Sequence, residues 1–424
     1  MTSAGTPVGS ANSATASMRI LFFSPRIFWP ADSGARIRDY YLLRALASRA
    51  SLTFLGICQP QEFDSLPQSG NGLNLQPEAI RVVPQSGRYS AWNLVRGFVG
   101  PTPLSILNYH DQRVAGELRR LLQEHSFDIV QIEGIHLAGY LPVIRSAPSR
   151  PLVICDWHDV ESDRMARFSE HAPNRLQDIY ARRTSSLLRA AEQKFLMDCD
   201  AHVMVSDRDL QLLRGMVPQI NAQVIENGVD VGFYAEQSDA AENERASVVF
   251  VGSMDFHPNV DAASYFGREV WPKIHAAAPG LQFVIVGSRP VSAVRKLAQV
   301  PGVTVTGTVE DVRPYYRKAL VAVAPLRIAG GTRLKILEAM AAGVPVVASC
   351  IGAEGLEVQP GQDFLVADTP DEIAAAVSRL HGSPALWRQL SARGRELVAA
   401  RYDWAALGES LYRVHRDLLA QRHG

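Results

Sequence analysis

Residues that can bind an anion gather in one short segment of the chain. A run that predicts a strand is followed by Gly330, Gly331 and Thr332 and then by a helical pattern. Glycines let a backbone approach a ligand closely, and the free amide groups at a helix start carry the positive end of the helix dipole. Thr332 adds a hydroxyl donor, while Arg327 and Lys335 can neutralise phosphate oxygens without a metal ion. The segment therefore predicts a site for a diphosphate that requires no metal.

The same segment also fits an ordinary capped helix. In that interpretation Thr332 is the N-cap, and Lys335 pairs with Glu338 three residues later. Glu338 separates the two interpretations, because it is a charge inside an otherwise apolar run and carboxylates are seldom buried without a partner. A ribose diol is a suitable partner, since one carboxylate can accept hydrogen bonds from two neighbouring hydroxyls. We therefore predict that the segment holds a nucleotide.

A second glycine loop and a histidine lie in the first half of the chain. Gly34 stands between the apolar run 19–23 and a helical pattern, and it is not part of a GxGxxG sequence, which argues against a nicotinamide cofactor. His158 and Asp159 follow another strand candidate, at the place where open α/β sheets gather ligand contacts. A simple strand-to-helix connection at Gly34 and a structural role for His158 stay open as alternatives.

Short apolar runs alternate with longer amphipathic stretches along the chain, a rhythm that is typical of parallel sheets covered by helices on both faces. The strand candidates form two series. The first consists of 19–23, 51–57, 128–132, 152–155 and 201–205, and the second of 248–251, 282–286, 303–306, 320–324 and 345–348. Two such series predict an α/β fold with two Rossmann-like domains.

Turn and polar residues predict the domain boundary. Asn227 and Gly228 form a turn signal, and the polar segment 236–244 follows. We expect a disordered tail that lacks the features of a secretion signal, an N-terminal domain, a C-terminal domain and a last helix able to cross back to the N-terminal domain. Their ranges are 1–17, 18–226, 227–402 and 403–424.

Bulk composition excludes several classes of protein. With 424 residues the chain is longer than one hydrophobic core usually becomes, which agrees with two domains. The 43 basic residues balance 43 acidic residues, so no overall charge attracts nucleic acid. The four cysteines form no CxxC pair, which fits a reducing cytoplasm and suggests neither a zinc site nor a disulfide framework.

Three sequence motifs resemble one enzyme family. The sequence EAMAAGVPVV over 338–347 resembles the signature of retaining glycosyltransferases with the GT-B fold, the group 1 type of glycosyltransferase family 4. The sequence NGVD over 227–230 resembles the segment that opens their donor domain. The sequence GSMDFHPNVD over 252–261 looks most like bacterial members that build exopolysaccharides or lipid-linked glycans.

The resemblance implies two domains that face each other across a cleft. It also implies an enzyme that transfers a hexose from a nucleotide diphosphate sugar to a glycan or lipid-linked acceptor, with retention of the anomeric configuration. It implies that Glu338 binds the donor ribose, that basic residues near the glycine loop bind the diphosphate, and that Gly34 faces the donor phosphate. His158 would hydrogen-bond the donor sugar, and Asp159 would help to fix the acceptor cleft. No cofactor is implied, because the family is thought to use the donor's own phosphate oxygen as the base, which leaves positioning and charge stabilisation to the protein.

The chain departs from the family pattern at the donor site. A family glutamate normally stands eight residues before Glu338, where this chain has Gly330, so the sequence does not name the hexose. Many members also have an arginine and a lysine after the first donor-domain strand, near the positions of Ser253 and Pro258. Arg327 and Lys335 are the candidates to replace them.

Some questions of partner and function stay open at this stage. The segment 88–98 mixes aromatic residues with arginines, as helices at a membrane interface do, and suits weak peripheral membrane contact that guides a lipid-linked acceptor. Helix packing inside the first domain explains the same pattern. Two alternative functions remain, a sugar-nucleotide epimerase of the same fold and a catalytically silent nucleotide-sugar-binding subunit. The oligomeric state is not determined by the sequence.

Overall fold

The computed structural model describes residues 17–31, 33–63, 73, 79–85, 90–170, 174–235, 245–328 and 333–423. The expected tail at 1–17 lies outside these residues except for Ser17. The predicted anion-site residues Gly330, Gly331 and Thr332 also lie outside them.

The first domain is built on a seven-stranded parallel sheet in the order β3-β2-β1-β4-β5-β6-β7. Its strands are β1 (Arg19–Ser24), β2 (Ser51–Cys58), β3 (Ile80–Pro84), β4 (Ile129–Glu133), β5 (Leu152–Trp157), β6 (Ala201–Met204) and β7 (Ala222–Val224). The central strands β1, β4 and β5 are buried on both faces, which explains why they read as continuous apolar runs.

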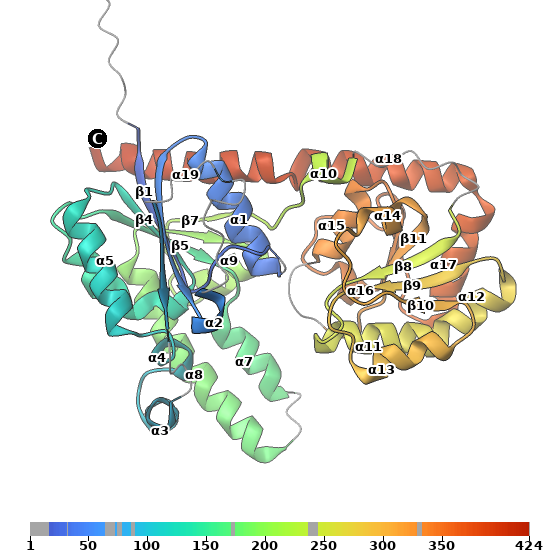
Figure 1. Ribbon diagram of the computed structural model, residues 1–424, viewed down its shortest axis with the longest axis horizontal. Coiled ribbons are helices and arrows are strands. Elements are labelled where there is room, and N and C mark those ends of the chain that lie inside the picture. Colours follow the sequence, from blue (N-terminus) through green and yellow to red (C-terminus); the bar gives the residue numbers. More distant parts are fainter. Residues whose placement is uncertain are drawn as a thin grey trace, which may run out of the picture.

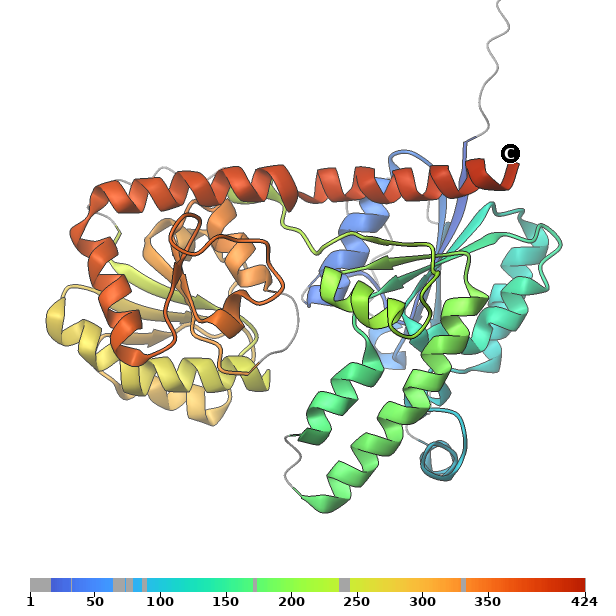
Figure 2. The ribbon, with the colours of Figure 1, turned by 180° about the vertical axis from the view of Figure 1, so that it is seen from behind.

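Helices surround this sheet (Figure 1). They are α1 (Gly34–Ala47), α2 (Pro60–Phe63), α3 (Ala91–Val99), α4 (Leu104–Leu107), α5 (Gln112–Glu124), the 3₁₀ helix η2 (Ile135–Tyr140), α6 (Leu141–Arg145), α7 (Glu161–Glu170), α8 (Arg175–Asp198) and α9 (Asp207–Arg214). Helices α7 and α8 pack against each other and project from the sheet beside α3 (Figures 1 and 2).

The second domain is built on a six-stranded parallel sheet in the order β10-β9-β8-β11-β12-β13. Its strands are β8 (Ser247–Val251), β9 (Gln282–Val286), β10 (Val303–Val305), β11 (Ala319–Ala324), β12 (Val346–Ala348) and β13 (Leu365–Val366). Its helical segments are α10 (Val231–Ala235), α11 (His257–Tyr265), the π helix η4 (Phe266–Val270), α12 (Trp271–Ala277), α13 (Ser292–Arg295), the 3₁₀ helix η5 (Lys296–Gln299), α14 (Arg313–Arg317), α15 (Leu334–Ala341), α16 (Cys350–Ala353), α17 (Pro370–Gly382) and α18 (Pro384–Arg401).

The last helix, α19 (Trp404–His423), follows α18 out of the second domain and packs along α1 of the first (Figures 1 and 2). The indole of Trp404 stacks on Tyr41 of α1, with ring centroids 5.4 Å apart and planes 6° from parallel. The two helices also meet closely at Gly408, where an added β-carbon would lie 2.2 Å from Cβ of Ala45. The chain therefore connects its two domains twice, once near residue 229 and once near residue 403.

The predicted fold of two parallel α/β domains is confirmed, and each of the ten strand candidates forms a strand with bounds shifted by at most two residues. The sequence missed β3, β7 and β13, which are edge strands. An edge strand needs only one hydrogen-bonded neighbour and is less buried, so its sequence carries a weak apolar pattern. No helix in the described part of the chain is both long and apolar enough to cross a membrane.

Candidate functional site

Helix α15 positions the two predicted donor-binding side chains of the second domain. It begins at Leu334, and Arg333, which occupies the N-cap position, makes no side-chain cap bond. The capped-helix alternative placed the N-cap at Thr332, whereas the structure places it at Arg333. Lys335 and Glu338 are three residues apart and project from the same side of the helix, and both are only partly buried.

Lys335 does not form the ion pair with Glu338 that the capped-helix interpretation predicted. Its Nζ donates a hydrogen bond of 2.6 Å to Oδ1 of Asn259 in α11 and lies 4.9 Å from the centre of the Phe250 ring. Burial, together with the charge of Arg333, lowers the pKa of Lys335 to about 8. The ammonium group is thus held at the end of β8 and remains largely charged at neutral pH.

Glu338 has partners inside the protein. The hydroxyl of Tyr316 donates a hydrogen bond of 3.3 Å to Oε2 of Glu338, and Tyr234 also hydrogen-bonds to this carboxylate. Burial raises the pKa of Glu338, while the two tyrosines act in the opposite direction. From the sequence, we predicted that the partner of this carboxylate is a ribose. The structure shows instead that two tyrosines already hold it, so its ribose role remains a prediction.

Arg327 is engaged in an ion pair that the sequence did not predict. Its Nε and Nη2 lie 3.0 and 2.5 Å from the two carboxylate oxygens of Asp261 in α11, and its guanidinium lies 4.5 Å from the centre of the Tyr265 ring. A phosphate would have to compete with Asp261 for this guanidinium. Of the two cations expected to replace the family's basic pair, Lys335 bonds to Asn259, whose amide in turn binds the loop that follows β8 at the Ser253 carbonyl, whereas Arg327 pairs with Asp261.

A third cation, Arg289, reaches the same loop and was missed by the sequence analysis. Its Nη2 donates a hydrogen bond of 2.9 Å to Oγ of Ser253, and its Nε donates one of 2.6 Å to Oδ2 of Asp255. Arg289 follows β9 and has a φ angle of 50°, an unusual conformation for a residue with a side chain. A lone arginine after a strand carries no sequence signal, because only the parallel pairing of β8 and β9 places it beside Ser253.

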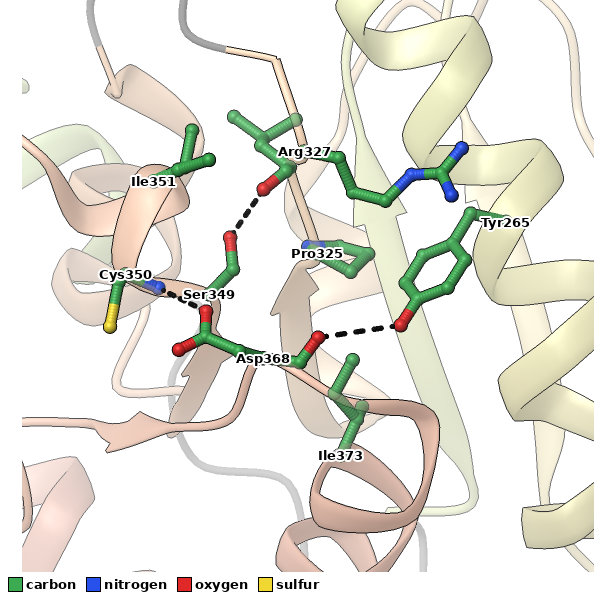
Figure 3. Close-up of a pocket in the computed structure, with 9 residues that line it drawn as sticks. Tyr265, Pro325, Arg327, Ser349, Cys350, Ile351, Asp368 and Ile373 are labelled. Atoms are coloured by element: carbon green, nitrogen blue, oxygen red, sulfur yellow. Dashed lines mark hydrogen bonds between the residues drawn. The ribbon is translucent and has the colours of Figure 1, made fainter.

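A pocket of about 390 Å³ lies where β11, β12 and β13 end (Figure 3). Its walls carry the side chains of Tyr265 and Arg327 on one side and Ser349, Cys350 and Asp368 on the other. The hydroxyl of Ser349 donates a hydrogen bond of 2.6 Å to the Leu326 carbonyl, and the Cys350 amide donates one of 2.8 Å to Oδ1 of Asp368. These bonds hold the ends of three strands together.

In the first domain, His158 lies at the carboxyl end of β5 among buried acidic side chains. Its Nε2 is 2.9 Å from Oε2 of Glu133 at the end of β4 and 3.4 Å from Oδ1 of Asp39 in α1. Burial is the main cause that lowers the pKa of His158, to about 4, so the ring is neutral at physiological pH. Glu133 and Asp39 are functional candidates that sequence reasoning missed, because strand and helix patterns do not show which buried carboxylates meet.

Asp159, the other residue predicted in this region, takes no part in that cluster. Its Oδ2 is 3.8 Å from Nε of Arg164 in the first turn of α7. Burial raises its pKa to about 6. Asp156, three residues earlier, is instead the buried carboxylate, and it accepts hydrogen bonds of 2.8 and 2.9 Å from Nε and Nη2 of Arg38.

Gly34 connects the two halves of the candidate site. It is the first residue of α1, and a β-carbon built on it would lie 3.7 Å from Cδ1 of Leu334, the first residue of α15. Asp39, five residues further along α1, is the residue that approaches His158. Helix α1 therefore begins beside α15, the helix that carries Lys335 and Glu338, and contacts His158 through Asp39.

Two protein-family models match the chain. A family model described as "Glycosyltransferase Family 4" matches residues 75–233, and a model described as "Glycosyl transferases group 1" matches residues 245–383. The first match covers much of the domain that contains His158, and the second covers the helix that carries Lys335 and Glu338. The chain belongs to the group 1 type of glycosyltransferase family 4.

Parts of this glycosyltransferase are similar to curated bacterial enzymes. It is 35% identical over 155 residues to the GDP-mannose-dependent alpha-(1-6)-phosphatidylinositol monomannoside mannosyltransferase of Mycobacterium tuberculosis, an alignment that covers 33% of this chain and 40% of that protein. It is 28% identical over 236 residues to the D-inositol 3-phosphate glycosyltransferase of Acidothermus cellulolyticus, covering 51% of this chain and 52% of that protein. The glycosyltransferase thus spans about half the length, or less, of these relatives.

Solved structures match the glycosyltransferase over nearly its whole length. Sucrose-phosphate synthase of Thermosynechococcus elongatus has a TM-score of 0.65 at 18% identity, covering 95% of this chain and 100% of that chain. Anabaena HepE, in a structure with UDP, has a TM-score of 0.62 at 12% identity, covering 94% and 100%. At these identities the likeness establishes the GT-B fold.

Proposed function

We propose that this protein transfers a hexose from a nucleoside diphosphate sugar to a glycan or lipid-linked acceptor, with retention of the anomeric configuration. The observation that carries the proposal is the placement of Lys335 and Glu338 on one side of α15, at the end of the helix that Gly34 approaches from the other domain. A cation and a carboxylate one helical turn apart suit a diphosphate and a ribose, which are neighbours in every nucleoside diphosphate.

The diphosphate is proposed to lie at the loop after β8. Lys335 and Arg289 both reach this loop, through Asn259 and Ser253 respectively. The side-chain amide of Asn259 donates a hydrogen bond of 3.0 Å to the Ser253 carbonyl, so the two contact points are fixed relative to each other. Two cations held in this way would neutralise phosphate charge that develops when the sugar leaves.

The transferred sugar is proposed to be mannose. This choice rests on the name of the M. tuberculosis relative, a GDP-mannose-dependent mannosyltransferase, and on the alignment at 35% identity. Retention is proposed because the family signature around Glu338 implies it. His158 is proposed to contact the sugar, since its ring keeps 18% of its side-chain surface exposed while the carboxylates around it are buried.

A lipid-linked acceptor is supported by an exposed apolar surface on the first domain. The surface consists of α3 and the N-terminal part of α8. Trp92, Val95 and Val99, on one face of α3, are 68%, 55% and 74% exposed, and Leu176 and Ile179 of α8 are 80% and 50% exposed. Large apolar side chains that are exposed together at a protein surface are typical of an interaction site.

The charges around this surface favour an anionic membrane as its partner. Arg96 lies on α3, and Arg175, Arg182 and Arg183 lie on α8, where Asp178 pairs with Arg182. Nη2 of Arg183 donates hydrogen bonds of 3.0 and 3.2 Å to the carbonyls of Val99 and Gly100, which joins the two helices. The helix-packing alternative for segment 88–98 does not account for the exposed side chains of Trp92 and Val95. Arg88 and Tyr89 lie outside the described residues.

The transfer reaction is tested with purified protein, a panel of GDP- and UDP-sugars and a lipid extract that supplies acceptors. We expect release of nucleoside diphosphate only when lipid acceptor is present, with GDP-mannose as the preferred donor and an α-linked product by NMR. Conversion of the sugar nucleotide to its epimer without acceptor would establish the epimerase alternative. Donor binding without turnover on any acceptor would establish a silent binding subunit.

A further inference from the structure

A cluster of charged side chains is buried where β1, β4 and β5 end in the first domain. Glu133, Asp39 and Asp156 are fully buried, and so is Arg38. Oxygen atoms of Asp39 and Glu133 and a ring nitrogen of His158 all lie within 4.8 Å of one another. Such a cluster can hold either a metal ion or a shared proton, and its hydrogen bonds and charges distinguish the two.

Two of the three carboxylates already have cationic partners. Asp156 accepts two hydrogen bonds from Arg38, whose Nη1 also donates to the Glu226 carbonyl at 3.1 Å. Oδ2 of Asp39 accepts hydrogen bonds from Oγ of Ser24 at 2.8 Å and Nη1 of Arg26 at 3.4 Å. Oδ1 of Asp39 receives no hydrogen bond from the described residues and lies 3.4 Å from Nε2 of His158.

Among the described residues, no arginine is bonded to Glu133. Its Oε1 accepts a hydrogen bond of 2.7 Å from Nε2 of Gln131, and its Oε2 is 2.9 Å from Nε2 of His158. With Glu133 ionised and His158 neutral, Arg26, Arg38, Asp39, Asp156 and this pair carry one net negative charge. A single added proton makes the buried cluster neutral, whereas a divalent cation leaves it with one positive charge. The charge count therefore favours a proton over a metal.

We propose that Glu133 is a positioning residue whose carboxyl group is protonated at neutral pH and donates a hydrogen bond to Nε2 of His158. Nδ1 of His158 then carries the ring hydrogen and presents an N–H group to the substrate. The proposal rests on the proposed function only for the identity of that substrate. Nε2 is occupied by Glu133 and flanked by Asp39, and Nδ1 forms no hydrogen bond within the described part of the chain. Nδ1 is therefore the ring nitrogen available to an oxygen of the donor sugar.

The environment of the pair agrees with this proton placement. Burial, followed by the charges of Asp156 and Asp39, raises the pKa of Glu133 well above its usual range. Burial, followed by the charge of Arg26, lowers the pKa of His158 to about 4. His415 of α19, which also faces Asp156, has a pKa lowered to about 4 by burial and adds no charge. At neutral pH the proton therefore stays on the carboxyl group, and the imidazole remains neutral.

Raising the pH should remove this proton and reverse the hydrogen-bond direction. Ionised Glu133 would accept the hydrogen from Nε2, and Nδ1 would then carry a lone pair in place of a hydrogen. A sugar oxygen that accepts from Nδ1 would lose its donor. We expect kcat to fall on the alkaline side as the pair ionises, while the KM for the nucleotide sugar changes little.

Substitutions at Glu133 test the proposal because glutamine imitates a protonated carboxyl group. Glu133→Gln can accept from Gln131 and donate to Nε2 of His158, whereas Glu133→Ala can do neither. We expect Glu133→Ala to lower kcat by about 100-fold. The kcat of Glu133→Gln should be at least tenfold higher than that of Glu133→Ala, and it should not fall at alkaline pH. Glu192→Gln is the matched control, since Glu192 is another fully buried glutamate of this domain, hydrogen-bonded to the Ser162 amide at 3.0 Å. The control should keep the wild-type pH profile.

A second measurement does not depend on activity. The ¹⁵N NMR spectrum of protein labelled at histidine, with His158→Gln to assign the signal, shows which ring nitrogen carries hydrogen. We expect a protonated Nδ1 at neutral pH in the wild type and in Glu133→Gln, and a shift of the hydrogen to Nε2 at alkaline pH in the wild type alone. A hydrogen on Nε2 at neutral pH, or an unchanged alkaline decline in Glu133→Gln, overturns the proposal. Stoichiometric Mn²⁺ or Zn²⁺ binding that disappears in Glu133→Gln also overturns it.

The failure of this proposal is distinguishable from the failure of the proposed function. If the wild-type protein turns over no sugar nucleotide, the transferase assignment fails, yet the NMR spectrum still reports the hydrogen on His158. If transfer proceeds and the hydrogen lies on Nε2, the transferase assignment stands and the role of Glu133 fails.

Discussion

Gly34 of the first domain lies opposite Leu334 of the second, so that a β-carbon at position 34 would be 3.7 Å from Cδ1 of Leu334. The two residues begin α1 and α15, whose N-termini thus approach each other from different domains. The distance is an ordinary van der Waals contact, so a methyl group fits there, whereas a longer side chain could extend to Leu334. Changing the size of the side chain at position 34 therefore tests how closely the two domains must approach each other for transfer.

Enlarging Gly34 should reduce transfer without unfolding the protein. We expect Gly34→Ala to keep kcat/KM within about threefold of the wild type and Gly34→Leu to lower it at least tenfold, because the leucine side chain would occupy the space in front of Leu334. Steady-state kinetics and thermal unfolding measure the two effects. Gly116→Leu in α5 is the control, since a β-carbon there meets nothing within 4 Å. Equal losses in the Gly34→Leu and Gly116→Leu variants would contradict the assignment.

Removing the ammonium group of Lys335 should weaken the binding of phosphates. We expect Lys335→Met to lower the affinity for GDP or UDP by about 10- to 100-fold while the affinity for the free nucleoside changes little, because the contact proposed for this cation is with the diphosphate alone. Isothermal titration calorimetry separates the two ligands. Lys296→Met, at an exposed position of η5, should bind both like the wild type. If Lys335→Met binds diphosphate and nucleoside with unchanged affinity, the phosphate site lies elsewhere.

The ribose role of Glu338 predicts a dependence on the sugar hydroxyls of the nucleotide. The wild type should bind GDP more tightly than 2′-deoxy-GDP, and Glu338→Ala should remove most of this difference, because the carboxylate accepts hydrogen bonds from the ribose diol. Tyr316→Phe removes one hydrogen bond to Glu338 and leaves the carboxylate in place, so we expect it to keep the preference for ribose. A ribose preference of the same size in Glu338→Ala would show that Tyr316 and Tyr234 are the only partners this carboxylate needs.

The buried ring of His202 should make the fold less stable in acid. Nδ1 of His202 accepts a hydrogen bond of 3.2 Å from the indole of Trp157, and Nε2 is 3.0 Å from the Leu196 carbonyl, so the neutral ring satisfies both partners. Burial lowers its pKa to about 4, and stability that is present above pH 6.5 is therefore lost as the pH falls towards 4. We expect His202 to contribute about 2 kcal/mol of the loss in unfolding free energy between pH 7 and 5.

Urea denaturation at both pH values measures this contribution. His202→Asn keeps an acceptor for Trp157 and cannot be protonated. Its free energy of unfolding should therefore differ less between pH 7 and pH 5 than that of the wild type. His125→Asn, at an exposed position after α5, should keep the wild-type difference. An identical pH dependence in His202→Asn and the wild type would show that the ring is not held neutral.

The surface of α3 and α8 should bind anionic membranes. We expect co-sedimentation with phosphatidylglycerol vesicles, weaker binding to phosphatidylcholine vesicles, and a loss of at least tenfold in Trp92→Ser combined with Leu176→Ser, because these side chains are the ones that would enter the lipid interface. Met197→Ser is the control, since Met197 is 68% exposed near the other end of α8. Dimerisation that the Trp92 and Leu176 variant abolishes, without vesicle binding in the wild type, would assign the surface to a second copy of the chain.

The sequence by itself determined the fold class and located the segment for which we propose donor binding. Parallel strands buried on both faces must be continuous apolar runs, so ten of them could be located, and the motif around Glu338 identified the helix that the family uses. Three of the four edge strands, β3, β7 and β13, were not predicted, because a strand with one neighbour needs less apolar sequence. Helical periodicity alone also predicts that Lys335 and Glu338, three residues apart, lie on the same side of α15.

Only the tertiary structure decided which side chains meet. Lys335 binds Asn259, Arg327 pairs with Asp261, and Glu133 reaches His158 although 25 residues separate the two in sequence. Parallel pairing brings the ends of distant strands to one edge of a sheet, and a one-dimensional pattern does not contain the order of strands within that sheet. The protonation states of the buried groups also depend on the tertiary structure. The burial that shifts the pKa values of Lys335, Glu133 and His158 exists only when the two domains are folded.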